Sequence, residues 1–158
     1  MSNSYLLPVY KEIYHETFSY DSFDKRMKMQ KAIYLLQEMG APVGDYAFFW
    51  YKHGPYSQDL QDAMYAATCS GMSTLHVTFS ADMNSAVQKI AELLNKKVSY
   101  SSSHWAECLA SLHYLQTNIF SASASPEEIV GELQKRKPHL SNKTLNLEAL
   151  RLVSELCA

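Results

Sequence analysis

The chain has 158 residues, of which 47% are hydrophobic and 12% aromatic. This composition excludes a disordered chain, and a chain of this length buries about 68–70% of the surface that it exposes when unfolded. Fourteen Lys and Arg residues against sixteen Asp and Glu residues give a net charge of −2, which argues against a nucleic-acid coat or a basic membrane binder. We therefore expect one domain over residues 1–158.

The N-terminal residues have neither the basic region nor the sustained apolar region of a secretion signal. No apolar run approaches the length of about 20 residues that a membrane-spanning helix needs. The three cysteines, Cys69, Cys108 and Cys157, are odd in number and far apart, so a disulfide framework is not expected. Together these features predict a cytoplasmic protein with reduced thiols.

Two helices are predicted at the start of the chain. Apolar residues recur at helical spacing from Leu6 onward, which indicates a helix over 7–19. A second helix follows the capping pair Asp21-Ser22 and ends at Gly40. We expect four basic residues on or beside its exposed face, namely Lys25, Arg26, Lys28 and Lys31.

The hydrophobic pattern then changes to that of strands. The aromatic run 46–51 lies between turn-forming residues and predicts a strand that is apolar on both faces. Ser57 is a good N-cap for a helix that extends to Thr68. Apolar and polar residues alternate over 75–79, which predicts a second strand. We expect the two strands to pair antiparallel, with the helix as a long connection between them.

The remainder of the sequence is typical of helices. Apolar stripes predict helices over 83–94, 105–119 and 147–156. Between the last two, Ser125-Pro126 starts a further helix and Lys137-Pro138 ends it. The fold class is therefore mainly α (α+β), a single helical domain with a small two-stranded antiparallel β element.

The segment after the aromatic run predicts a sharp corner. Gly54 can adopt a positive φ, and Pro55 fixes φ near −65°. The helix that begins at Ser57 would then present unpaired N–H groups beside His53 and Tyr56, which can accept a carboxylate or a phosphate. The alternative interpretation is that Gly54-Pro55 only forms the corner and Ser57 only caps the helix.

Two spaced motifs resemble a known family. Gln30-Lys31 is followed by Tyr34-Leu35, and Trp50 is followed by Gly54-Pro55, Ser57 and Leu60. This arrangement is similar to the Panacea domain, the SocA-like antitoxin family of bacteria and their phages, with its uncharacterised YwgA-like relatives. The similar stretch covers residues 23–70. Tyr56 stands where the antitoxin branch has a Val-like residue, so the chain is nearer to the uncharacterised relatives.

The resemblance implies a mostly helical fold and a function in binding another protein, typically a toxin encoded nearby. It implies no cofactor and no catalytic residues. Aromatic residues support a binding role, because fourteen of the nineteen fall within residues 5–65, and Tyr and Trp are favoured interface anchors. The predicted partner-binding surface consists of Trp50, Tyr51, His53, Gly54, Pro55, Tyr56, Ser57, Gln58, Gln61 and Tyr65.

Enzymatic chemistry has little support in the sequence. Ser57, His53 and Asp59 are close together, but a triad needs the imidazole between the nucleophile and the carboxylate, and Asp59 is expected to point to solvent at the start of the helix. No glycine-rich phosphate loop is present.

A metal site is also not expected. His104, Glu107 and Cys108 can share a helix face, but Cys108 falls within an apolar stripe. His113 is about 180° around the helix from His104 and cannot complete the set.

Two alternatives remain open. The order helix, strand, helix, strand is that of a winged-helix DNA-binding regulator, but the candidate recognition helix carries Asp59 and Asp62, and no Lys or Arg occurs over 53–88. The basic residues gather elsewhere, at 25–31 and at Lys135, Arg136, Lys137, His139 and Lys143, where they are interpreted as a helix end and a solvated loop. The second alternative is a phage-associated accessory protein.

Overall fold

The computed structural model describes residues 5–70 and 77–158. These residues form a mainly helical domain with one small antiparallel sheet of two strands. The elements are α1 (Leu6–Tyr14), α2 (Phe23–Glu38), β1 (Phe49–Tyr51), β2 (Gly54–Tyr56), α3 (Gln58–Cys69), α4 (Ala81–Leu94), α5 (Ser102–Tyr114), the π-helical turn η2 (Leu115–Ile119), α6 (Pro126–Arg136) and α7 (Lys143–Leu156).

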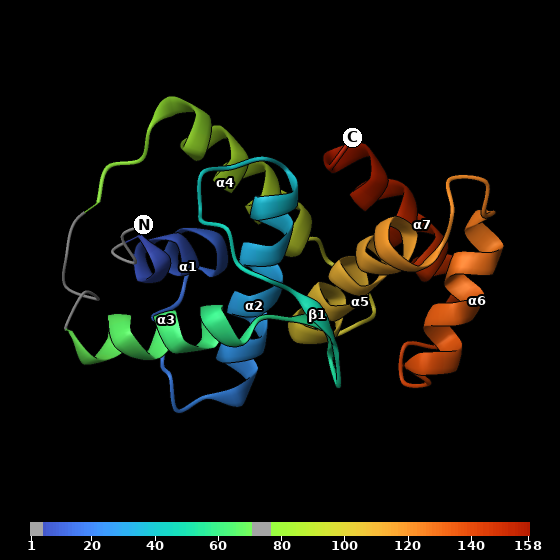
Figure 1. Ribbon diagram of the computed structural model, residues 1–158, viewed down its shortest axis with the longest axis horizontal. Helices are drawn as coiled ribbons and strands as arrows, with labels where there is room; N and C mark the ends of the chain where they lie inside the picture. The colour runs from blue at the N-terminus through green and yellow to red at the C-terminus, as the bar shows by residue number, and fades with distance from the viewer. Residues whose placement is uncertain (1–4, 71–76) are drawn as a thin grey trace.

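Helices α2 and α5 pack against each other at the centre of the domain (Figure 1). Helix α1 packs against α4 and α3 on one side of this pair, and α6 and α7 pack against each other and against α5 on the other side. The two strands lie at the middle, where β2 contacts both central helices. The hairpin therefore lies where the two halves of the helical domain meet.

Side-chain caps start several helices as the sequence predicts. Ser22, Ser57 and Ser125 each accept a hydrogen bond from the backbone N–H three residues later, at the starts of α2, α3 and α6. Ser125 and Glu128 form a reciprocal capping box. The first helix is shorter than expected, because His15 adopts a left-handed conformation with φ of 58° and ends α1 at Tyr14 rather than at residue 19.

The predicted pairing of the strands is wrong. Strand β1 pairs with β2, in the register Phe49 with Tyr56 and Tyr51 with Gly54, so that only residues 52–53 separate the strands. Residues 46–48 of the aromatic run lie outside the strand. Of the second predicted strand, residues 75–76 lie outside the described residues, and 77–79 form no strand. The chain turns back at once because Gly54 has a φ of +87°, which most side chains disfavour.

The expected exposure of basic residues on α2 is also wrong for two of them. Lys28 and Lys31 are buried, with 6% and 1% of their surface exposed. Every residue from Met27 to Leu36 is buried, because α2 is enclosed by other elements around its whole circumference. The lysine at the end of α6, Lys137, is likewise buried rather than solvated.

None of the helices within residues 5–70 and 77–158 is both long and apolar enough to cross a membrane.

Candidate functional site

The two halves of the sequence motif meet in the structure. The Gln30 side chain on α2 accepts a hydrogen bond from the Ser57 N–H at 2.9 Å and donates one to the Ser57 carbonyl, also at 2.9 Å. The next residue, Lys31, donates from Nζ to the Pro55 carbonyl at 2.8 Å. Because these groups are buried, their hydrogen bonds fix the backbone between β2 and α3 against α2. The motif therefore builds the corner and orients the hairpin.

Gly54 brings the hairpin into close contact with α5. A Cβ atom added at Gly54 would lie 2.2 Å from the Oγ atom of Ser111, which is itself buried on α5. A side chain at position 54 would therefore push β2 away from the central helix pair. The glycine meets two requirements at once, the positive φ of the turn and this close approach.

Burial makes Lys31 an unusual cation. The ammonium group is buried against the hairpin, and this desolvation lowers its pKa from the usual 10.5 to about 7. The Glu107 carboxylate partly offsets the effect, whereas Lys137 adds to it. Near neutral pH, the charge of Lys31 therefore depends on small changes in its surroundings.

A pocket of about 180 Å³ opens between α2, the hairpin and α3. Three aromatic residues contribute to its wall, and Phe23 and Tyr51 among them are each 55% exposed. Arg26, Lys31 and His53 also line it. Among the residues that the structure describes, no Asp or Glu contributes to the wall. The complete lining is Phe23, Arg26, Met27, Gln30, Lys31, Tyr51, His53, Tyr56 and Gln61.

Aromatic and cationic groups of this pocket contact one another. The Phe23 ring packs edge-on against the His53 ring, with centroids 5.1 Å apart, and the rings of Tyr51 and Tyr56 lie 5.5 Å apart. The Arg26 guanidinium lies 5.8 Å from the centroid of the Phe23 ring. Burial lowers the pKa of His53, so its imidazole is predominantly neutral at pH 7. The pocket thus offers flat apolar surfaces next to a fixed positive charge.

The structure brings together only part of the predicted partner-binding surface. Four of its residues line the pocket: Tyr51, His53, Tyr56 and Gln61. Another three, Gly54, Pro55 and Ser57, are buried and serve the corner.

The remaining predicted residues lie outside the pocket. Tyr65 is exposed on α3, where its ring contacts the Tyr20 ring at 5.2 Å. Trp50 is partly buried beneath Arg136 and Lys137, and Gln58 is exposed. Five further pocket residues were not predicted from the sequence, namely Phe23, Arg26, Met27, Gln30 and Lys31. The signal in the sequence that links α2 to this site is the Gln30-Lys31 pair of the motif.

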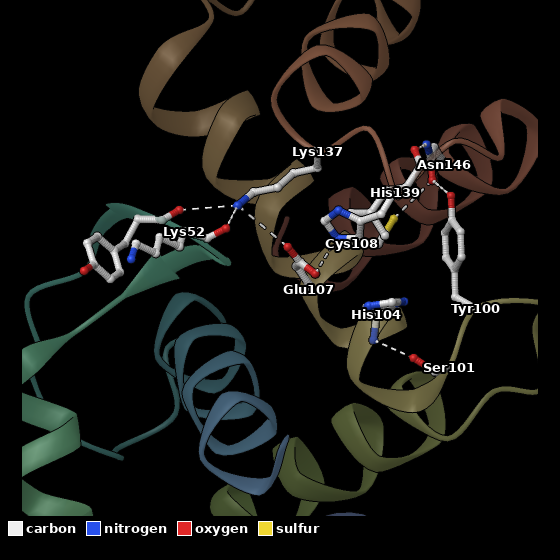
Figure 2. Close-up of polar contacts among 11 residues, drawn as sticks. Lys52, Tyr100, Ser101, His104, Glu107, Cys108, Lys137, His139 and Asn146 are labelled. Carbon is white, nitrogen blue, oxygen red and sulfur yellow. Dashed lines mark hydrogen bonds and ion pairs between the residues drawn. The ribbon is translucent and has the colours of Figure 1, made fainter. Parts of the chain in front are cut away.

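A second group of polar residues lies beside the hairpin (Figure 2). Glu107 on α5 is buried, and its Oε1 atom lies 3.0 Å from Nε2 of His139. Lys137 lies 3.7 Å from the other carboxylate oxygen and also donates hydrogen bonds to the carbonyls of Tyr51 and Lys52. This lysine therefore connects the end of α6 to the hairpin that carries the pocket.

The structure confirms that Cys108 is a buried thiol, as its place in an apolar stripe predicts. The Cys108 thiol is buried and points toward Asn146, with its Sγ atom 3.4 Å from Oδ1. Burial raises the pKa of this thiol, which keeps it protonated. His113 is on another face of α5, where its Nδ1 atom bonds to the Tyr34 hydroxyl at 2.8 Å. His139, from the loop between α6 and α7, instead lies beside His104.

Comparison of the chain with protein-family models, curated proteins and solved structures finds no match.

Proposed function

We propose that the protein is a non-enzymatic protein-binding module that uses the pocket between α2 and the hairpin. The observation that carries this proposal is the combination of exposed aromatic rings, Arg26 and Lys31 in one pocket whose described lining contains no carboxylate. Aromatic and Arg side chains are the residues that most often dominate the energy of protein interfaces. Tyr51 and Phe23 are already exposed, so a partner could cover them without unfolding the site.

The chemistry of the pocket selects the kind of segment that it binds. An apolar side chain of the partner would fill the space between Phe23, Tyr51 and Tyr56. An Asp or Glu next to that side chain would pair with Arg26, which has no competing carboxylate in the described lining. The proposed ligand is therefore a polypeptide segment with an apolar anchor beside an acidic residue.

The resemblance to the Panacea and SocA-like antitoxins suggests which partner the pocket binds. The partner would be a toxin encoded nearby, which the protein neutralises or delivers for degradation by direct contact. The fixed corner supports this proposal, because Gln30 and Lys31 hold the hairpin in place before any partner arrives. A preformed surface loses less conformational entropy on binding.

Co-expression with the product of the adjacent gene tests the antitoxin proposal. We expect the wild-type chain to restore growth and the double variant Tyr51→Ala/Tyr56→Ala to fail while its melting temperature stays close to that of the wild type. Phe49→Ala is the matched control, because Phe49 is on the same hairpin and is 68% exposed but does not line the pocket. Restored growth with the double variant would contradict the proposed role of the pocket, and a non-toxic neighbour would contradict the antitoxin role.

A further inference from the structure

Three potential metal ligands come together from two separate parts of the chain. His104 and Glu107 lie one turn apart on α5, and His139 lies in the loop between α6 and α7. One ligand atom from each residue lies within 4.8 Å of the others. Figure 2 shows these side chains side by side, and the two imidazole rings have centroids 5.0 Å apart.

The buried carboxylate is the second observation that points to a ligand. The Glu107 side chain is only 1% exposed, yet its Oε2 atom has no hydrogen-bond partner within the described residues. Lys137 approaches Oε2 but remains 3.7 Å away, and its ammonium group also bonds to two backbone carbonyls of the hairpin. The other oxygen, Oε1, faces His139. A buried carboxylate is costly unless cations or hydrogen-bond donors satisfy both oxygens.

We propose that His104, Glu107 and His139 bind a divalent transition-metal ion, with Zn²⁺ as the preferred ion. Two imidazole nitrogens and one carboxylate oxygen form a ligand set that suits Zn²⁺. His104 is exposed and His139 is 41% exposed, so water has access to the fourth position. In the part of the chain that the structure describes, Oε2 has no hydrogen-bond partner and Lys137 stays 3.7 Å from it, so the Glu107 carboxylate has an oxygen left to bind a metal.

The geometry needs only side-chain movement to reach that of a zinc site. Ligand atoms around tetrahedral Zn²⁺ are about 3.3 Å apart when the bonds are about 2.0–2.1 Å long. The present separations of up to 4.8 Å therefore have to shorten by rotation of the two histidines. Because both rings reach solvent, this rotation displaces no core residue. The bound metal would fasten the α6–α7 loop to α5.

Titration of the metal-free full-length chain with ZnCl₂ in a calorimeter tests this proposal. We expect one Zn²⁺ to bind per chain and the melting temperature to rise by roughly 5–10 °C when free Zn²⁺ is about 100 times the Kd. His104→Ala should weaken binding at least tenfold while leaving the fold intact, since His104 makes no side-chain hydrogen bond to Glu107 in the structure. The double variant His104→Ala/His139→Ala should bind no Zn²⁺.

The matched control is His15→Asn, which removes an exposed histidine outside the cluster and keeps a residue that tolerates the left-handed conformation at that position. This variant should bind Zn²⁺ like the wild type. Co²⁺ substitution gives a second readout, because its visible absorption reports directly on ligand number. Absence of saturable one-to-one binding by the wild type would overturn the proposal, as would an unchanged Kd in His104→Ala.

Discussion

At the scale of single residues, Lys31 shows how a charged side chain serves both structure and site. Its ammonium group holds the Pro55 carbonyl at 2.8 Å, and the side chain also contributes to the pocket wall. Substitution by an uncharged residue of similar length would remove the hydrogen bond but also remove the cost of a buried charge. The pH dependence of stability separates these two contributions.

We predict that the free energy of unfolding rises as pH increases from 7 to 8.5. The pKa of Lys31 is about 7 in the folded protein and 10.5 in the unfolded chain, so in this window the unfolded state binds more protons. The limiting slope for this group is about 1.4 kcal/mol per pH unit. Urea unfolding of Lys31→Met across the same pH range should show a smaller slope. An equal slope in the variant would show that Lys31 keeps its proton in the folded state.

At the same scale, we predict that His113 lowers the free energy of unfolding as the pH falls below 6.5. Burial lowers its pKa from 6.5 to about 4, and its Nδ1 atom bonds to the Tyr34 hydroxyl. The neutral ring makes its 3.8 Å contact with Glu38 a polar contact rather than an ion pair at pH 7. Between pH 6.5 and 5 the unfolded chain therefore takes up a proton that the folded protein does not, and stability falls.

The urea midpoint of the wild type and of His113→Gln at pH 6.5 and pH 5 measures this effect. The glutamine amide can still accept the Tyr34 hydrogen bond but does not titrate. The variant should lose less stability on acidification than the wild type. If both lose the same amount, the His113 ring is protonated in the folded protein.

At the scale of elements, the hairpin depends on Gly54. We predict that Gly54→Ala lowers the free energy of unfolding by more than about 2 kcal/mol, because alanine is strained at a φ of +87° and its Cβ atom would meet Ser111. Gly131→Ala is the matched control, since a Cβ atom at this helical position meets nothing within 4 Å. It should stabilise the protein by about 0.5–1 kcal/mol. Equal effects of the two substitutions in urea unfolding would contradict this account.

Much of the element structure could be predicted from the sequence because its signals are local. The caps Ser22, Ser57 and Ser125 act within three residues, and each starts a helix as expected. The strand pairing was not predictable in the same way. Residues 52–53 are Lys and His, which are not the usual residues of a tight hairpin turn, so the alternating pattern over 75–79 suggested a more distant partner.

The burial of α2 was hidden from sequence analysis for a related reason. Gln30 and Lys31 look like surface residues, and they can be buried only because carbonyl groups from residues 55 and 57 meet them. Helical periodicity carries no information about such distant partners. Likewise, the contact between Glu107 and His139 joins positions 32 residues apart, and the packing of α6 and α7 against α5 brings them together.

At the scale of the whole molecule, the pocket and the Glu107 cluster are both connected to the hairpin. The pocket lies on one side of it, and Lys137 fastens it to the Glu107 cluster through the carbonyls of Tyr51 and Lys52. The exposed part of α3 carries Asp59 and Asp62, which makes that surface unsuited to a phosphate backbone.

The most direct test of the proposed binding function is selection of peptides from a displayed random library by the purified chain at about 150 mM salt. We predict enriched peptides with an apolar residue beside Asp or Glu, whose affinity falls at least tenfold for Tyr51→Ala and for Arg26→Glu. Phe49→Ala should bind them like the wild type, because Phe49 does not line the pocket. Failure to enrich any peptide, or equal affinity of the selected peptides for all variants, would contradict the account.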